Sequence, residues 1–276
     1  MTVVAVTMVR DEADVIGSTV AHMLAQVDAV VVADNLSDDE TPDVLAELKA
    51  EHGDRLVVVD DDDPAYEQSR KMTHLARFGA EWFEAEWVVP FDADEWWYSP
   101  HHDRLADALA TVAARWHVVP AELFDHVATG LDPDEVNPVR RLGWRRRAPG
   151  PLPKVAARYR PDLVIEQGNH GAHYEEFQPA AIPPALIVRH FPYRSVEQFV
   201  RKVHNGAAAY RAAGDRQRAD HGAHWRQWGE ILDNHGEDAL AEIFRKWYWR
   251  AEPAEPVQIE GESQPALIFD PAPGIL

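Results

Sequence analysis

The stretch "TVVAVTMVRDEADVIGSTVAHMLAQVDAVVVADNLSDDETPD", residues 2–43, contains two apolar runs separated by a segment of different periodicity. The β-branched run at 2–9 and the apolar run at 29–33 are typical of buried strands. Between them, apolar residues from Val15 to Val27 recur at helical spacing. A strand, a helix and a second strand in this order predict a βαβ unit with parallel strands.

The same alternation continues through the first hundred residues. Thr41 followed by Pro42 and Asp43 reads as an N-cap, a first-position proline and an early acid of a helix that ends at Gly53. The further elements predicted here are a strand at 55–59, a helix at 67–84 and a strand at 86–91. We therefore expect an α/β fold with a mostly parallel sheet and flanking helices.

The second half of the chain is less regular. The predicted elements are a helix at 101–116 and strands at 117–124, 154–159, 163–170 and 185–191. Between 125 and 153 the stretch "PVRRLGWRRRAPGPLP" predicts a loop or flap, whose arginines either bind an anionic ligand or neutralise nearby acids.

The C-terminal part is predicted to be helical. Ser195 with Gln198 fits a capping box that opens a helix through about Ala213, and two amphipathic helices follow to about Arg250. The tail is proline-rich, which favours an extended course over the surface. We expect a domain at 1–215, with a donor-binding half at 1–100 and an acceptor half at 101–215. A helical segment and extended tail at 216–276 complete the chain.

Composition excludes several classes of protein. The 276 residues suffice for a large α/β domain, and 47 acidic against 27 basic residues give a formal charge of −20 that repels nucleic acid. The absence of cysteine excludes disulfides and thiolate metal sites. Because no apolar stretch approaches the length of a membrane span and no signal peptide is evident, we expect a cytoplasmic protein without a transmembrane segment.

Three carboxylates directly follow the fourth predicted strand, in "VVPFDADEWW" at 88–97. In an extended chain, residues two apart project to the same side, so Asp92 and Asp94 can point at one object while Glu95 points away. Paired carboxylates suit Mg²⁺ or Mn²⁺, which complete their coordination with water and substrate phosphates. The alternative is a turn with solvated acids.

Ligands of parallel α/β sheets bind beyond the carboxyl ends of the strands. That rule places residues 7–12, 34–39 and 92–95 on one rim. A nucleotide-sugar donor would account for this rim, because its departing nucleoside diphosphate needs a Lewis acid and its ribose or base needs an acceptor such as Asp34.

The segments "TMVRDEADVI", "VVADNLSDDETPDVL" and "VVPFDADEWW" resemble, in order and spacing, the N-terminal half of GT-A glycosyltransferases, especially the family 2-like bacterial branch. The resemblance covers residues 1–100, and 168–170 and 189–202 are similar to late motifs of that branch. It implies a GT-A fold, which is Rossmann-like, with additional C-terminal helices. It also implies a metal-dependent, inverting, hexosyltransferase-like enzyme that moves a sugar from a nucleoside-diphosphate donor to a carbohydrate or other hydroxyl acceptor.

The resemblance also assigns roles to individual residues. It implies donor contacts from Thr7, Val9, Arg10, Glu12, Asp34 and Asp92. Arg70 becomes a candidate for the diphosphate, with an ordinary exposed helix charge as the alternative. Asp92 and Asp94 become metal ligands, completed by His190 or His170, although either histidine could instead be a structural side chain.

The catalytic base is not assigned by a motif, because the Glu-Asp pair of the family is not evident. Its place in the chain order leaves Glu166, His170, Glu175 and Glu176 as candidates. Two other functions stay open. One is a non-catalytic nucleotide or carbohydrate binder of the same fold. The other is a metal-dependent nucleotidyltransferase, although "TMVRDEAD" lacks the glycines of a phosphate-binding loop.

Overall fold

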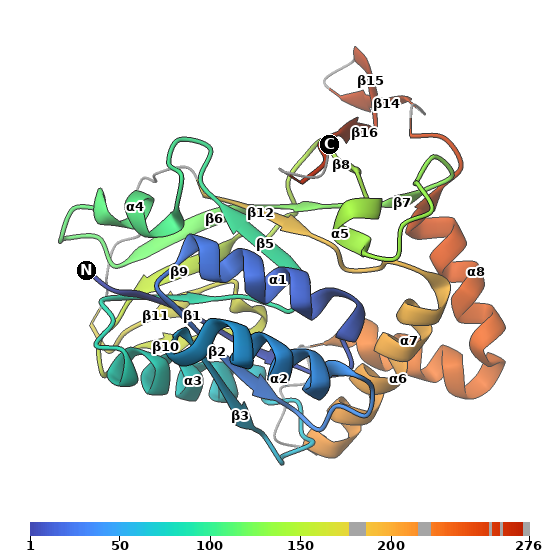
Figure 1. Ribbon diagram of the computed structural model, residues 1–276. Helices are drawn as coiled ribbons and strands as arrows, with labels where there is room; N and C mark the ends of the chain where they lie inside the picture. Colours follow the sequence, from blue (N-terminus) through green and yellow to red (C-terminus); the bar gives the residue numbers. More distant parts are fainter. Residues whose placement is uncertain (177–185, 215–221, 254–255, 260–261, 273–276) are drawn as a thin grey trace. The chain divides into compact units, whose positions relative to one another are not determined.

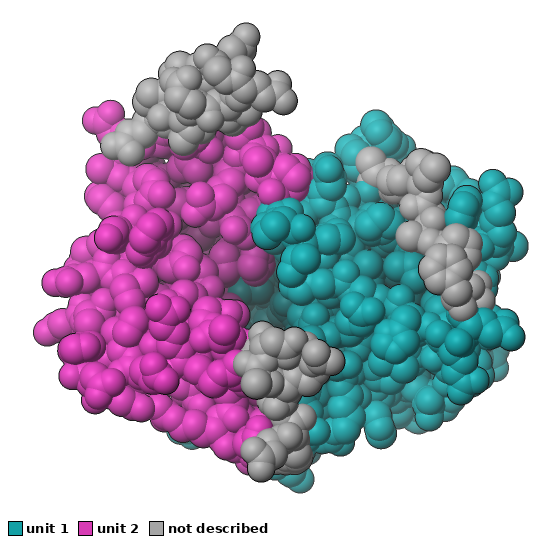
Figure 2. All heavy atoms as spheres, turned by 180° about the vertical axis from the view of Figure 1, so that it is seen from behind, with its two compact units in different colours: residues 1–63, 67–123, 150–189 teal, residues 64–66, 124–149, 190–276 magenta. Residues whose placement is uncertain are grey.

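The structure is a computed structural model that describes residues 1–176, 186–214, 222–253, 256–259 and 262–272 (Figure 1). The chain forms two compact units, coloured separately in Figure 2. Unit 1 comprises residues 1–63, 67–123 and 150–189, and unit 2 comprises residues 64–66, 124–149 and 190–276. The domain boundary predicted after residue 215 lies outside the described residues and stays a prediction.

The first half of unit 1 alternates strands and helices. Its elements are β1 (Val3–Val9), α1 (Ala13–Gln26), β2 (Ala29–Asp34), α2 (Thr41–His52), the 3₁₀ turn η1 (Gly53–Arg55), β3 (Leu56–Asp60), α3 (Gln68–Trp82) and β4 (Trp87–Pro90). Strand β1 pairs in parallel with β2 and with β4, and β2 pairs in parallel with β3. The βαβ units predicted from the sequence are confirmed.

Both faces of this parallel sheet are covered by helices (Figure 1). Val3 and Ala5 of β1 belong to a core that includes buried residues of α1 and α2, whereas Val4 and Val6 belong to a second core with α3. Alternate residues of a strand face opposite sides, so a strand that is apolar throughout is buried on both faces. This explains why the strands read as continuous apolar runs.

The sheet of unit 1 continues with antiparallel strands. Its order is β3-β2-β1-β4-β9-β6-β12-β5. The added elements are β5 (Glu95–Tyr98), α4 (Leu105–Ala110), β6 (Val118–Asp125), β9 (Lys154–Arg158), β10 (Val164–Ile165), the 3₁₀ turn η2 (Gln167–Asn169), β11 (Ala172–His173) and β12 (Leu186–His190). Strand β9 pairs antiparallel with both β4 and β6, and the last residues of β6 and β12 belong to unit 2. The predicted fold class, an α/β fold with flanking and C-terminal helices, is confirmed.

Several predicted boundaries in this region are wrong. The helix predicted at 101–116 is the shorter α4, and the strand predicted at 163–170 is β10 followed by η2. Strand β5 was not predicted, because acidic residues precede it. The backbone N–H of Glu95 donates to the carbonyl of Asp92 at 3.0 Å, so a turn separates β4 from β5.

Unit 2 contains the C-terminal helices. Helices α6 (Val196–Ala213), α7 (Ala223–His235) and α8 (Glu237–Trp247) pack against one another. Aromatic rings fill the space between them, with the centroid of Phe199 at 5.3 Å from Trp228 and 5.5 Å from Tyr248. Among the residues that the structure describes, no helix has both the length and the apolar character needed to cross a membrane.

The arginine-rich stretch and the C-terminal tail of unit 2 contain paired strands. The elements are β7 (Ala128–Thr129), α5 (Pro138–Arg141), β8 (Trp144–Arg146), β13 (Trp249–Arg250), β14 (Pro256–Ile259), β15 (Glu262–Pro265) and β16 (Leu267–Phe269). Strand β8 pairs antiparallel with β16, and Nε of Arg145 lies 2.5 Å from Oδ2 of Asp270. The prediction of a plain loop at 125–153 is therefore wrong, because its strand β8 pairs with β16 of the tail. The extended course of the tail stays a prediction.

Helix α6 begins as the sequence predicts. The Oγ of Ser195 accepts a hydrogen bond from the backbone N–H of Gln198 at 3.1 Å, and Oε1 of Gln198 accepts from the N–H of Arg194 at 3.1 Å. We expect Ser195→Ala to lower the free energy of unfolding by about 1 kcal/mol, because one buried helix N–H loses its acceptor. Urea denaturation measures the change. Ser195→Asp keeps an acceptor and should unfold like the wild type; an equal loss in both variants would contradict the capping role.

Candidate active site

The carboxyl ends of the first three strands lie side by side. In the parallel register, Val9 of β1 is opposite Asp34 of β2, and Asp34 is opposite Asp60 of β3. The loops that follow these strands therefore begin at one edge of the sheet. This is the edge at which parallel α/β sheets bind ligands.

The loops after β1 and β2 are joined by hydrogen bonds. The N–H of Asp11 donates to Oγ of Ser37 at 3.0 Å, and the N–H of Asp38 donates to Oδ1 of Asp11 at 2.7 Å. The N–H of Glu12 donates to Oγ1 of Thr41 at 3.0 Å. Thr41 is therefore the first residue of α2, and its side chain binds the neighbouring loop. The sequence predicted Thr41 as the N-cap of this helix, which is wrong, because Glu40 takes that position.

Asp34 lies at the centre of this rim. Its Oδ1 accepts a hydrogen bond from Oγ of Ser37 at 2.5 Å. Burial raises the pKa of Asp34, as do the nearby charges of Asp11 and Asp60, while the hydrogen bonds from Ser37 oppose the rise. A half-buried carboxylate at the end of a strand is suited to accept hydrogen bonds from the hydroxyls of a ribose.

The predicted donor contacts of the first loop differ in exposure. Thr7 and Val9 are buried in the sheet at 0% and 3%, and Glu12 is 8% exposed. Arg10 has 30% of its side chain exposed. Its Nε makes no hydrogen bond to the described residues and lies 3.9 Å from Oδ2 of Asp11. Of these four residues, Arg10 is therefore the one best placed to meet an anionic ligand.

Arg70 is on α3 and is already paired. Its Nη2 lies 2.9 Å from Oδ2 of Asp63 and 3.1 Å from Oε2 of Glu67, and 51% of the side chain is exposed. These pairs fit the alternative that the sequence left open, an exposed helix charge. The diphosphate role of Arg70 stays a prediction.

The acidic motif forms a turn whose carboxylates are engaged by other side chains. Oδ1 of Asp92 accepts from Nε2 of Gln68 at 3.0 Å and from Nδ2 of Asn169 at 2.9 Å. Oδ2 of Asp92 lies 2.6 Å from Nζ of Lys154. Glu95 does not point away from Asp92, as an extended chain would require, because its Oε1 lies 2.7 Å from the same ammonium.

The fit of a divalent metal to this motif can be tested on these contacts. Asp94 is 2% exposed, and both oxygens of Asp92 have protein donors. Within the described parts of the chain there is no group of three or more histidine or acidic side chains that could hold a metal ion. In this arrangement the residues do not fit a resident divalent ion, because an ammonium group is already paired with Asp92, one of the two predicted ligands.

The two histidines predicted to complete a metal site have other contacts. Nδ1 of His170 lies 2.9 Å from the carbonyl oxygen of Pro153. His190 belongs to unit 2, where its Nδ1 lies 2.8 Å from Oδ1 of Asp125. Asp125 was not predicted as a site residue, and its signal in the sequence is its position at the end of the strand before the arginine-rich stretch. A carboxylate that orients a histidine ring is an arrangement used in proton transfer.

The remaining base candidates lie near η2 and β11. Oε1 of Glu166 lies 3.4 Å from Nδ1 of His173, and 53% of the Glu166 side chain is exposed. Glu175 and Glu176 are exposed, and the N–H of Glu175 donates to Oδ2 of Asp162 at 3.2 Å. The assignment of the base among the predicted residues stays a prediction.

Sequence reasoning also missed Gln68, Lys154 and Asn169, which meet at Asp92. Asn169 is fully buried and has a positive φ of 56°. The available signals were a lysine at the start of an apolar strand and the short segment "GNH". Neither signal indicates which carboxylate the side chain contacts.

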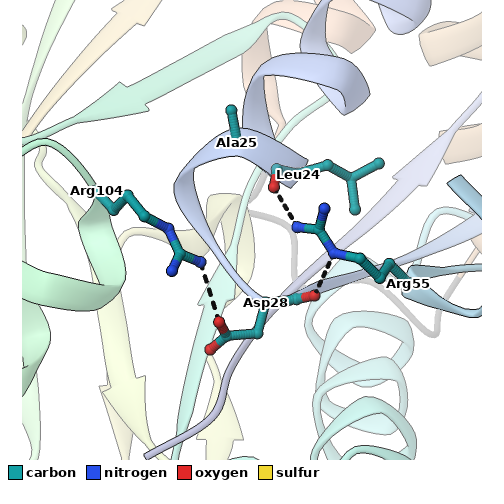
Figure 3. Close-up of a pocket in the computed structure, with 5 residues that line it drawn as sticks. All are labelled: Leu24, Ala25, Asp28, Arg55 and Arg104. Carbon is teal, nitrogen blue, oxygen red and sulfur yellow. Dashed lines mark hydrogen bonds and ion pairs between the residues drawn. The ribbon is translucent and has the colours of Figure 1, made fainter.

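A separate pocket of about 410 Å³ lies at the opposite edge of the sheet (Figure 3). Asp28 and Arg55 line it, and they directly precede β2 and β3. Arg55 donates to the carbonyls of Asp28 and Val27, and Arg104 pairs with Asp28 at 3.0 Å. These contacts close the C-terminal end of α1 and account for the arginines without a ligand.

No family model matches the chain, and no curated protein matches it either. Among solved structures, it is similar to the mannosyltransferase PcManGT from Pyrobaculum calidifontis in complex with GDP-Man and Mn²⁺, at 16% identity over 89% of this chain and 87% of that chain, with a TM-score of 0.39. It is also similar to S. aureus TarS 1–349 in complex with UDP-GlcNAc, at 11% identity, 99% and 98% coverage and a TM-score of 0.42.

A third similar structure is glucosyl-3-phosphoglycerate synthase from Mycobacterium tuberculosis in complex with Mg²⁺ and UDP. The identity is 18%, the matched part is 44% of this chain and 43% of that chain, and the TM-score is 0.32.

Proposed function

We propose that the chain is a GT-A glycosyltransferase that transfers a sugar, with inversion, from a nucleoside-diphosphate donor to a hydroxyl acceptor. The observation that carries the proposal is the rim at the carboxyl ends of β1, β2 and β4. Asp34 is held by Ser37 there, and the loop after β1 is hydrogen-bonded to the loop after β2. These loops are the segments whose order and spacing resemble the donor-binding half of that family.

Two residues of the rim have proposed tasks. Asp34 accepts hydrogen bonds from the nucleoside, and the guanidinium of Arg10 binds the diphosphate, because 30% of its side chain is exposed and its Nε has no hydrogen-bond partner among the described residues. The base that deprotonates the acceptor is one of the four predicted residues, Glu166, His170, Glu175 or Glu176. An inverting reaction needs one such base on the acceptor side, within hydrogen-bond reach of the attacking hydroxyl.

The experiment that tests this proposal is the binding of nucleotides to an Asp34 variant. We expect Asp34→Ala to weaken UDP, UMP and a UDP-sugar alike, by about 10- to 100-fold, because a charged acceptor contributes about 1.5–3 kcal/mol and the three ligands share the base and ribose. GDP, GMP and a GDP-sugar form the parallel series. Isothermal titration calorimetry measures the affinities.

Asp107→Ala, at an exposed position of α4, is the matched control and should bind like the wild type. A loss confined to the sugar-bearing ligand would show that Asp34 contacts the sugar and not the nucleoside. If no nucleotide binds to the wild type in either series, the proposed donor class is wrong.

The non-catalytic binder of the same fold is the second candidate. It would bind the same nucleotides without turnover. Slow release of free sugar from a nucleotide sugar, abolished in Arg10→Ala, is expected of the enzyme and not of the binder. A nucleotidyltransferase would instead release pyrophosphate from a nucleoside triphosphate.

A further inference from the structure

Lys154 reaches the acidic motif through the antiparallel pairing of two strands. In the pairing of β4 with β9, Val88 is opposite Ala157 and Trp87 is opposite Arg158. Because the strands run in opposite directions, the start of β9 lies beside the end of β4. Lys154 is the first residue of β9, and Asp92 follows the end of β4.

The ammonium group of Lys154 is enclosed by three oxygen atoms. Its Nζ lies 2.6 Å from Oδ2 of Asp92 and 2.7 Å from Oε1 of Glu95, and it donates to the carbonyl of Gly168 at 2.8 Å. The side chain is 4% exposed. The ammonium therefore donates hydrogen bonds to Asp92 and Gly168 and forms an ion pair with Glu95.

The charge state of this lysine follows from its surroundings. Two carboxylate oxygens lie within 2.7 Å of its Nζ, and opposite charges at this distance favour the charged form of the lysine. The group is therefore a permanent cation near neutral pH. It occupies Asp92, one of the two carboxylates that the sequence predicted as metal ligands.

The remaining oxygen atoms of the two carboxylates are also engaged. Oδ1 of Asp92 accepts from Gln68 and Asn169, and Oε2 of Glu95 accepts from Nε1 of Trp97 at 3.2 Å and from the N–H of Asp92 at 3.1 Å. A divalent ion at this place would meet strong repulsion from the buried ammonium. It would also have to replace several hydrogen bonds at once.

We propose that the cation of the acidic motif is the ammonium group of Lys154, and that Asp92 and Glu95 hold this group in place of Mn²⁺ or Mg²⁺. The motif then serves to fix the turn after β4 and to position the start of β9 and η2. One consequence of this assignment, that the nucleotide donor binds without a metal, rests on the proposed function. The assignment of Lys154 itself does not.

The first test is direct binding of Mn²⁺ to the full chain, followed by electron paramagnetic resonance. We expect the wild type to bind Mn²⁺ no more tightly than about 1 mM, the range of weak carboxylate sites. Lys154→Met removes the charge and keeps the length of the side chain. It should bind one Mn²⁺ at least about tenfold more tightly than the wild type, because the buried carboxylate of Glu95 and the partly exposed carboxylate of Asp92 lose their cation.

Two further variants control this test. Lys154→Met combined with Asp92→Asn should lose the gain, which would place the new ion at Asp92. Lys49→Met removes a half-buried lysine whose Nζ donates to the carbonyl of Gly53, far in sequence from the acidic motif, and it should behave like the wild type. Absence of any gain in folded Lys154→Met would overturn the proposal.

If Lys154→Met does not fold, Mn²⁺ binding to the wild type alone still tests the proposal. Stoichiometric Mn²⁺ binding at micromolar concentration, lost in Asp92→Asn, would show that the metal displaces the lysine and would overturn the proposal. Failure of Mn²⁺ to bind at that concentration supports it.

The second test compares nucleotide binding in EDTA and in Mn²⁺. We expect the affinities of UDP and GDP in the two buffers to agree within about threefold, since no ion is shared between protein and diphosphate. A larger gain with Mn²⁺ contradicts the proposal. If neither nucleotide binds in either buffer while the Mn²⁺ results are as expected, the proposed function fails and the assignment of Lys154 stands.

Discussion

Lys154→Met is expected to lower the free energy of unfolding by about 3–5 kcal/mol, because it leaves the carboxylates of Asp92 and Glu95 without their cation in a buried site. Glu95 is 0% exposed, so water does not replace the lost partner there. The carbonyl of Gly168 loses its donor as well. The change is larger than that of a typical surface substitution because a buried charge is left unpaired.

Chemical denaturation of the wild type and a set of variants measures this effect. In Lys154→Met combined with Glu95→Gln, part of the loss should be recovered, because the neutral amide leaves one fewer buried charge. Lys49→Met should lie within about 0.5 kcal/mol of the wild type. A loss below about 1 kcal/mol in Lys154→Met would indicate that water reaches the carboxylates and that the ion pair is not buried.

The local patterns of the first hundred residues were sufficient to predict the fold class. Neighbouring strand residues such as Val4 and Ala5 face opposite sides of the sheet, and both are apolar. The helix between β1 and β2 shows apolar residues at helical spacing, so each element is indicated by its own residues. The start of α6 at Ser195 was predicted for the same reason, since a cap and its acceptor are neighbours in the chain.

The contacts of the acidic motif could not be predicted in this way. Asp92 is 62 residues from Lys154 and 77 residues from Asn169. Their meeting depends on the antiparallel pairing of β4 with β9, whose register is not indicated by either segment alone. The pairing of β8 with β16 could not be predicted either. Each strand has only three residues, and β8 lies in the arginine-rich stretch whereas β16 lies in the tail.

The turn at the end of β4 explains why the argument from an extended chain was wrong. Alternation of side chains holds within a strand, and the hydrogen bond from the N–H of Glu95 to the carbonyl of Asp92 ends the strand there. Glu95 can therefore share Lys154 with Asp92. The residues predicted to contact the donor were easier to place in the fold, because Arg10 directly follows β1 and Asp34 ends β2, its parallel partner.

Acidification is expected to destabilise the protein through His22. Burial lowers the pKa of His22 from 6.5 to about 4; the hydrogen bond to the carbonyl of Trp97 acts in the opposite direction, and the charge of Arg189 adds to the lowering. The ring stacks on Trp96 with a centroid distance of 4.2 Å, and Nε2 lies 2.8 Å from the Trp97 oxygen. The neutral ring is therefore the form that the folded state accommodates.

The direction in which the free energy of unfolding changes with pH follows from this lowered pKa. Above pH 6.5 the ring is neutral in both the folded and the unfolded chain, and its titration contributes nothing. Between pH 6.5 and about 4 the unfolded chain binds a proton that the folded chain does not, so stability falls as the pH falls. The contribution of His22 is a loss of about 2 kcal/mol at pH 5 and about 3 kcal/mol below pH 4.

Urea unfolding of the wild type and His22→Gln at pH 7.5 and pH 5 isolates this contribution, because the other titrating groups are common to both proteins. Glutamine keeps a donor for the Trp97 carbonyl and does not titrate. The stability of His22→Gln relative to the wild type should therefore rise by about 2 kcal/mol between the two pH values. His235→Gln, at an exposed ring at the end of α7, should show no such change. An equal difference between wild type and His22→Gln at both pH values would mean that the ring can be protonated in the folded state, and that its contact with Trp96 does not exclude the charged form.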